Sequence, residues 1–195
     1  MDFPKEHCVE GRYDALILIS FGGPESREEV IPFLERVLQG RNVPKDRMLE
    51  VAEQYFHFGG VSPINAQNRQ LVSSIAGEFD GRGPDLPVYW GNRNWHPLLE
   101  DTLRQMSSDG VRRALAFVTS AFSSYSSCRQ YLEDIEAARI AVGKHAPNVD
   151  KLRVYYNHPG FVHANADNVR AAFACLEGRE QETTPLLFSA HSIPQ

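Results

Sequence analysis

The chain has 195 residues, of which 42% are hydrophobic and 23% are charged, and its formal net charge at pH 7 is −5. These are ordinary values for a globular protein, and an acidic chain without a basic stripe argues against a nucleic-acid-binding surface. No apolar stretch is long enough to span a bilayer, and residues 1–7 lack the apolar segment of a signal peptide. The three cysteines are widely spaced and form no CxxC pair, which favours reduced thiols, so we expect a cytoplasmic protein without a transmembrane segment.

Five short apolar runs predict the strands of a sheet. Each run is continuous and does not alternate with polar residues, which is typical of parallel strands that are covered on both faces. In chain order the runs are 15–19, 86–90, 114–118, 152–156 and 185–188.

The segments between these runs carry apolar residues at helical spacing. Six helical faces follow in chain order, at 30–38, 48–56, 71–79, 98–106, 131–138 and 169–176. Ser26 and Glu29 have the spacing of a capping box, but that start would place Pro32 inside the helix, so we expect a kink or a later start. Strands that alternate with helices predict an α/β fold with a doubly wound parallel sheet, and the polar stretch 177–182 is a candidate domain boundary.

The segments after the strands hold the unusual residues, and ligands of parallel sheets bind at that edge. Ser-Phe-Gly-Gly-Pro at 20–24 forms either a close approach to a ligand or a plain tight turn. Arg93, between two asparagines and two tryptophans, would suit a planar carboxylated ligand, or the segment simply starts the next helix. The seven hydroxyl side chains within 120–131 favour binding of an anionic group, or they are simply more than a helix cap needs.

Two further positions are candidates for chemistry. In Gly-Gly-Val-Ser-Pro at 59–63, Ser62 either hydrogen-bonds a ligand carboxylate or caps the following helix. His158 and His191 follow the fourth and fifth predicted strands. A lone histidine at a strand end is usually structural, but His191 is at the fifth strand end in succession that carries polar residues, which favours a functional role. The sequence contains no Ser/His/Asp triad pattern and no zinc-ligand spacing.

Four of these segments, in this order, resemble the ferrochelatase family, whose members insert ferrous iron into a porphyrin. They are Ser-Phe-Gly-Gly-Pro at 20–24, Gly-Gly-Val-Ser-Pro at 59–63, Gly-Asn-Arg-Asn-Trp-His-Pro at 91–97 and Phe-Ser-Ala-His-Ser-Ile-Pro at 188–194. The resemblance implies the first of two Rossmann-like domains over 13–177, and the opening strand and metal-site motif of the second over 184–195. It also implies that His191 coordinates the metal or accepts a pyrrole proton, with a glutamate further downstream as its usual partner.

The subtype and the substrate contacts also follow from the resemblance. Protoporphyrin-using members typically carry Tyr-Pro-Gln where this chain has the stretch 119–123, and Cys-Arg-Gln-Tyr at 128–131 is similar to the bacterial coproporphyrin III enzymes. In that group, residues at the positions of Ser62 and Tyr131 contact the carboxylates of the macrocycle. Coproporphyrin III is therefore the favoured substrate; the alternatives are protoporphyrin IX, another tetrapyrrole with cobalt or nickel, or a half-enzyme that binds tetrapyrrole without catalysis.

The resemblance implies no cofactor within this chain, and the porphyrin and ferrous iron are substrates. Some relatives hold a [2Fe–2S] cluster through cysteines mostly near the C-terminus, but neither Cys128 nor Cys175 is a convincing ligand by itself. Phe21 stands where relatives often have tyrosine, so it can pack on a macrocycle but cannot donate a hydroxyl proton. The strand at 185–188 belongs to the second domain, and we expect it to be frayed or misplaced in this chain because it lacks its own sheet.

Overall fold

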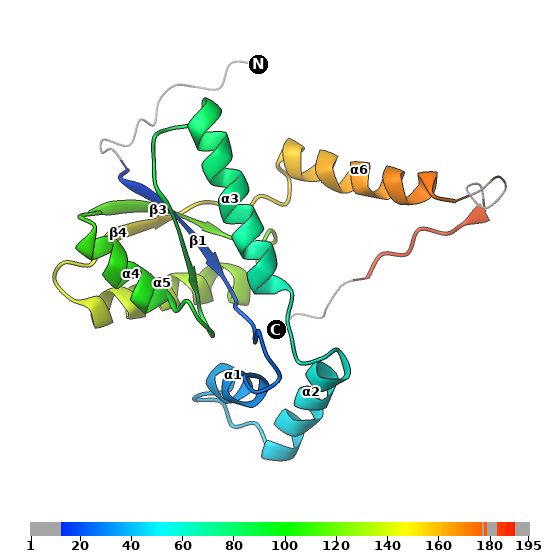
Figure 1. The fold of residues 1–195 in the computed structure, drawn as a ribbon, viewed down its shortest axis with the longest axis horizontal. Helices are drawn as coiled ribbons and strands as arrows, with labels where there is room; N and C mark the ends of the chain where they lie inside the picture. Colours follow the sequence, from blue (N-terminus) through cyan, green and yellow to red (C-terminus); the bar gives the residue numbers. More distant parts are fainter. Residues whose placement is uncertain (1–12, 177, 179–182, 190–195) are drawn as a thin grey trace.

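The computed structural model describes residues 13–176, 178 and 183–189. It contains a parallel sheet in the order β2-β1-β3-β4, formed by β1 (Ala15–Ser20), β2 (Val88–Asn92), β3 (Arg113–Val118) and β4 (Asn148–Lys151) (Figure 1). The helices are α1 (Val30–Val37), α2 (Lys45–His57), α3 (Ile64–Arg82), α4 (Leu99–Ser108), α5 (Gln130–Val142) and α6 (Pro159–Ala174). A π-helical turn, Tyr125–Arg129, leads into α5. The predicted α/β fold with a Rossmann-like, doubly wound parallel sheet is confirmed.

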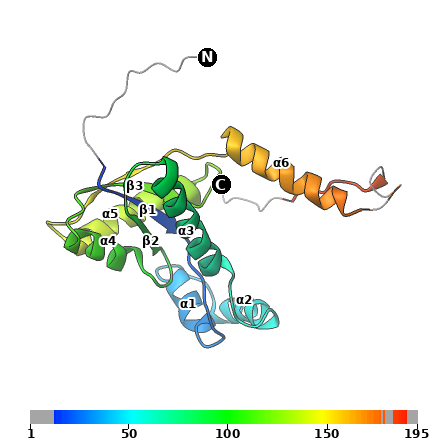
Figure 2. The ribbon, with the colours of Figure 1, turned by 45° about the horizontal axis from the view of Figure 1, so that its top comes forward.

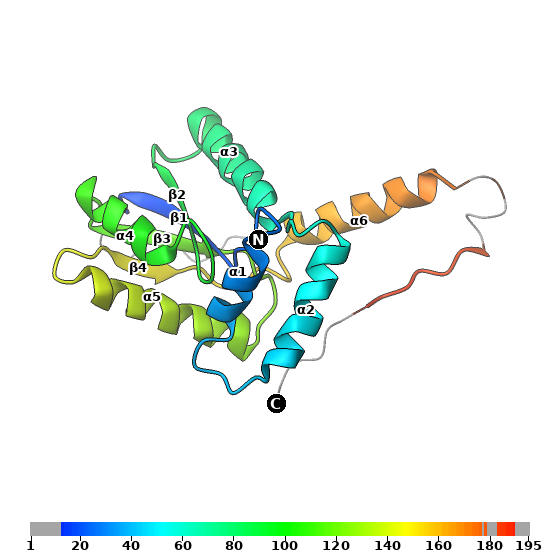
Figure 3. The same ribbon diagram turned by 60° about the horizontal axis from the view of Figure 1, so that its bottom comes forward.

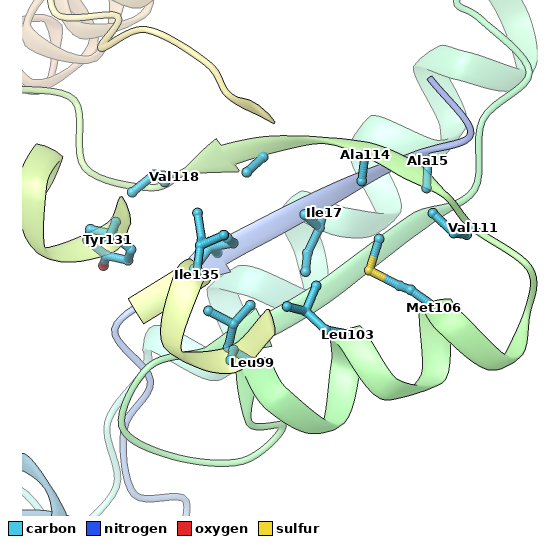
Figure 4. Close-up of a cluster of buried hydrophobic side chains, with 13 residues drawn as sticks. Ala15, Ile17, Leu99, Leu103, Met106, Val111, Ala114, Val118, Tyr131 and Ile135 are labelled. Atoms are coloured by element: carbon cyan, nitrogen blue, oxygen red, sulfur yellow. The ribbon is translucent and has the colours of Figure 1, made fainter. Parts of the chain in front are cut away.

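The central strand β1 is buried along its whole length, which explains its continuous apolar sequence. Its alternate residues Ala15, Ile17 and Ile19 face the layer of α4 and α5, and Figure 4 shows Leu103 and Met106 of α4 pointing toward the strands. Helix α3 contacts β1 and β2 and lies on the opposite face of the sheet (Figures 2 and 3). The sheet is thus covered by helices on both faces.

Helices α1 and α2 pack on each other beyond the carboxyl end of β1 and form a second, smaller core (Figure 3). Phe33 is its most buried large residue. Helix α1 begins at Val30, which places Pro32 in the first turn, where its missing N–H needs no partner within the helix. Of the two expectations for this helix, the later start is the one observed. The carboxylate of Glu29 accepts hydrogen bonds from the Glu25 amide (2.8 Å) and from Trp95 Nε1 (2.7 Å).

The strand predicted at 152–156 is wrong: the fourth strand is β4, which ends at Lys151. It pairs on one side only, with β3, and alternates between exposed and half-buried residues. A continuous apolar run is the signature of a strand covered on both faces, so it does not detect this polar edge strand. The apolar residues that follow pack beyond the strand, where the Tyr155 ring stacks on Phe117 at 5.0 Å and its hydroxyl donates to Thr119 O at 2.9 Å.

The apolar run at 185–188 forms no strand in this chain, as expected for a strand that lacks its own sheet, since residues 184–189 have no strand assignment. Leu187 and Phe188 are 85% and 87% exposed, and a strand needs a neighbour to pair its backbone groups and bury its apolar side chains. Helix α6 contains no buried residue and extends away from the sheet (Figures 1 and 2). His191 and the rest of 190–195 lie outside the described residues. Within the described part of the chain, no helix is both long and apolar enough to cross a membrane.

Candidate functional site

Three of the segments singled out in the sequence meet at the carboxyl edge of the sheet. The amide of Arg93 donates to Ser20 O at 3.0 Å, and that of Asn94 donates to Phe21 O at 3.1 Å, so the loops after β1 and β2 run side by side. The loop after β3 joins them, because the Thr119 hydroxyl donates to Ser20 Oγ at 3.1 Å. The expectation that these polar segments share one edge is confirmed.

Two buried asparagines tie this edge to the start of α3. Asn65 Nδ2 donates to Gly23 O at 3.1 Å and to His96 O at 3.3 Å. Asn92 Nδ2 donates to Asn65 Oδ1 at 3.2 Å, and Asn92 Oδ1 accepts from Trp90 Nε1 at 3.0 Å. Both side chains are fully buried and their amides are satisfied, so the network fixes the loops in place. Sequence reasoning assigned no role to Asn65; its position two residues after the Gly-Gly-Val-Ser-Pro segment is the one signal that points to it.

The glycines after β1 are required by packing against the protein's own atoms. Gly22 has φ +81°, and a Cβ there would lie 2.9 Å from Asn92 Cβ. A Cβ on Gly23 would lie 2.7 Å from both Cβ and Oγ of Ser62. Of the two interpretations of this segment, the tight turn therefore accounts for both glycines without a ligand.

We expect Gly23→Ala to lower the free energy of unfolding by about 1–3 kcal/mol, because the added methyl group overlaps Ser62. Thermal unfolding of the whole protein measures this change. Gly77→Ala is the matched control, since Gly77 lies within α3 with no atom within 4 Å of the added Cβ. The control should be stabilised, by up to about 1 kcal/mol. Equal thermal-unfolding midpoints for Gly23→Ala and wild type would contradict the close approach of the loop after β1 to the loop that holds Ser62.

Ser62 lies half-buried between the β1 loop and α3. Its amide donates to Pro24 O at 2.8 Å, and its Oγ accepts from the Ile64 amide at 3.4 Å, a long contact for a helix cap. The side chain also faces a hollow of about 460 Å³ at the end of α2. This hollow is lined by Val51, Gln54, Tyr55, Phe58, Val61, Ser62 and Pro63, most of which are apolar or aromatic. The N-cap of α3 is Pro63 and has no side-chain cap bond, so the cap predicted for Ser62 amounts to this one long contact. The ligand contact of Ser62 stays a prediction.

A second hollow, of about 290 Å³, lies at the edge of the sheet and is lined by Phe21, Arg93, Thr119, Ser120 and Tyr131. Tyr131 is only 4% exposed and belongs to the main core, where Figure 4 shows its hydroxyl oxygen directed away from Val118. Burial raises the pKa of Tyr131, and the nearby Arg93 partly opposes that shift. Because the ring is buried, it is poorly placed to contact a ligand. A ligand could reach Tyr131 only through the part of the side chain that lines the hollow.

Arg93 does not offer a free charge to a ligand. It forms an ion pair with Asp134 of α5, and its guanidinium lies 4.7 Å from the centre of the Tyr131 ring. Burial raises the pKa of Asp134, and the Arg93 charge opposes this. Trp95 is also structural, since it donates to Glu29 and packs edge-on against Phe33 at 6.0 Å. Arg93 and Trp95 thus both have partners within the protein, and the next helix, α4, begins only at Leu99.

The sequence reasoning did not single out Asp134. The sequence does contain a signal for it: an acidic residue lies one helical turn after Tyr131, close to the apolar face of the predicted helix. A charge in that position needs a partner.

The serine-rich segment after β3 is largely a helix cap. Ser124 Oγ accepts from the Ser127 amide at 3.1 Å, and Ser127 Oγ donates to Phe122 O at 2.5 Å. The cap interpretation therefore holds for these two serines, and Ser120 remains on the wall of the second hollow. His158 is also structural, because its Nδ1 accepts from the Gly160 amide at 3.1 Å and caps α6.

Among the described residues there is no group of three or more histidine, cysteine or acidic side chains that could hold a metal ion. Cys128 lies 3.6 Å from Ser123 Oγ and Cys175 lies 3.3 Å from Ala171 O, so each thiol has its own local partner. The predicted metal-site residue, His191, lies outside the described residues, so the structure does not place it.

Comparison with known proteins identifies relatives along nearly the whole chain. The ferrochelatase family model matches residues 13–195. The chain is 60% identical, over 93% of its length, to a protein of Rhodopirellula baltica named ferrochelatase. It is 56% and 54% identical, also over 93% of its length, to proteins of Nocardia farcinica and Mycobacteroides abscessus named coproporphyrin III ferrochelatase. The chain spans about half the length of these curated relatives, covering 52%, 51% and 52% of them.

Proposed function

This chain belongs to the ferrochelatase family, and on that premise we propose that the whole protein inserts ferrous iron into a porphyrin, in haem biosynthesis. One observation of the structure supports the proposal most. The loops after β1, β2 and β3 meet at the carboxyl edge of a parallel sheet, beside two hollows lined by Ser62 and Tyr131. We also propose that the protein is cytoplasmic and that its substrates are a porphyrin and ferrous iron.

His191 is proposed as the residue that binds the metal or accepts a pyrrole proton. Metal insertion removes two protons from the pyrrole nitrogens, and imidazole is a base that is neutral near pH 7. Ferrous iron also accepts imidazole ligands readily. The support for His191 is its place in the segment at 188–194, which resembles the metal-site motif of the family.

Ser62 and Tyr131 are proposed to hold the carboxylates of the porphyrin. Ser62 suits this role because a hydroxyl stands beside a largely apolar hollow, so one site offers both packing for a macrocycle and a donor for its acid groups. Tyr131 makes the smaller contribution to carboxylate binding, through the part of its side chain that lines the second hollow. Neither residue is proposed to contact the metal.

We expect Ser62→Ala to weaken coproporphyrin III binding about tenfold or more, because a hydrogen bond to a charged group contributes roughly 1.5–3 kcal/mol. Tyr131→Phe should weaken binding by a smaller factor, because Tyr131 is largely buried. Fluorescence titration of the whole protein measures the dissociation constant. Tyr125→Phe is the matched control, since Tyr125 is exposed, donates to Glu133 at 3.0 Å and lines neither hollow. A variant that binds as tightly as wild type removes its residue from the proposed site.

Coproporphyrin III is proposed as the substrate in preference to protoporphyrin IX. The relatives of Nocardia farcinica and Mycobacteroides abscessus carry that substrate in their names, and the stretch 119–123 lacks the Tyr-Pro-Gln of protoporphyrin-using members. Steady-state assays of the whole protein with both porphyrins should give the higher kcat/KM for coproporphyrin III. A higher value for protoporphyrin IX would overturn the choice.

A further inference from the structure

We propose that Arg93 is a positioning residue, whose ion pair with Asp134 holds the loops after β1 and β2 and the start of α5 in the arrangement that the porphyrin requires. This inference rests on the proposed function, since it assigns a residue to the same site. It differs from the substrate contacts proposed above, because Arg93 would act through the residues that it holds.

One guanidinium lies against three residues from two separate parts of the chain. Its Nε pairs with Asp134 Oδ2 on α5, and its plane lies over the Tyr131 ring on the same helix. It is also 5.8 Å from the centre of the Phe21 ring, in the loop after β1. Because the Arg93 amide donates to Ser20 O, both ends of the residue are fixed. A shift of α5 or of the Phe21 loop therefore requires this contact to break.

The burial of this pair separates it from the other ion pairs of the described residues. The Arg93 side chain is 10% exposed, and the next most buried arginine in a pair, Arg113, is 26% exposed. Asp134 is 28% exposed. Removing one partner from such a pair leaves the other charge poorly solvated, whereas an exposed pair is easily replaced by water. The structure therefore depends on this pair more than on a surface ion pair.

Arg93 also lines two hollows. One is the hollow lined by Phe21 and Tyr131, and the other has a volume of about 200 Å³ and is lined by Arg36, Glu100 and Asp134. Loss of the Arg93 side chain would remove part of the wall of both hollows, so the wall against which a macrocycle is proposed to pack would change shape.

A double-mutant cycle in the whole protein tests this role. We expect Arg93→Gln and Asp134→Asn each to weaken coproporphyrin III binding about fivefold or more, and the double variant to bind no worse than the weaker single variant. The KM for porphyrin should rise, the KM for ferrous iron should stay unchanged, and the Soret band of bound porphyrin should shift from its wild-type position. Asp150→Asn is the matched control, because it breaks the Arg113–Asp150 pair between β3 and β4. The control should leave the porphyrin affinity, both KM values and the Soret band unchanged.

Arg93→Lys tests the same positioning role if the other variants do not fold. Lysine retains the charge for Asp134 but lacks the planar group that lies over Tyr131, so we expect a folded protein with weakened porphyrin binding and a shifted Soret band. Wild-type affinity and an unshifted band in a folded Arg93→Lys or Asp134→Asn variant would overturn the inference. A wild-type protein that binds neither coproporphyrin III nor protoporphyrin IX would instead overturn the proposed function.

Discussion

Replacing His191 by alanine in the whole protein is expected to lower the rate of iron insertion by at least about 100-fold. A positioned general base contributes roughly 10²–10⁴ to a rate, and His191 is proposed both to accept a pyrrole proton and to bind the incoming metal. Porphyrin binding should be retained, because the proposed carboxylate contacts, Ser62 and Tyr131, lie on other segments. The measurement is the steady-state rate of ferrous iron insertion at saturating coproporphyrin III.

His158→Ala is the matched control for this experiment. Like His191, His158 follows an apolar run of the sequence, but the structure assigns it to the cap of α6. Its replacement should lower the stability by about 0.5–2 kcal/mol, as the loss of a cap does, and leave the insertion rate unchanged. A His191→Ala enzyme within about tenfold of wild type, a barrier difference of only about 1.4 kcal/mol, would refute the assignment of His191.

Residues 1–195 expressed alone are expected to insert neither iron nor zinc above the rate without protein. The chain spans about half the length of its curated relatives, and the resemblance to the family places the glutamate that partners His191 further downstream. A site with one wall cannot hold a macrocycle rigidly or exclude water from the reacting nitrogens. The side chains of Leu187 and Phe188 fit this expectation, since both are more than four-fifths exposed.

The same assay on the whole protein supplies the reference rate. Insertion of either metal by residues 1–195, in a preparation free of the whole protein, would contradict the prediction. It would also require a different proton acceptor within these residues. His96 would be the first to replace, since it lies in the loop after β2, whose residues Arg93 and Asn94 contact the loop after β1.

The sequence predicts the central part of the fold well because its signals are local. The runs at 15–19 and 114–118 are continuous and apolar, and both become strands within the core of the sheet. The same rule fails for β4, an edge strand with one neighbour, and it assigns the apolar residues after it to a strand that does not form. It fails again at 185–188, where an apolar run has no strand beside it to complete a sheet.

The site is less predictable because its contacts join distant segments. The sequence correctly places the polar loops at one edge, but it does not reveal that Asn65 reaches Gly23 across 42 residues. Nor does it reveal that Arg93 is already paired with Asp134, which removes it as a ligand for a carboxylate. Residue type and spacing indicate what a side chain can do, whereas the partner depends on how the loops pack.

The central claim is that this chain supplies one wall of a porphyrin metallation site, and the most direct test is ferrous iron insertion into coproporphyrin III by the whole protein. The visible spectrum distinguishes the free porphyrin from its metal complex, so the rate can be followed continuously under anaerobic conditions. We predict a metallation rate well above that without protein, abolished in His191→Ala and unchanged in His158→Ala. Tight binding of coproporphyrin III with no insertion above the rate without protein would contradict the account and establish the non-catalytic, tetrapyrrole-binding alternative.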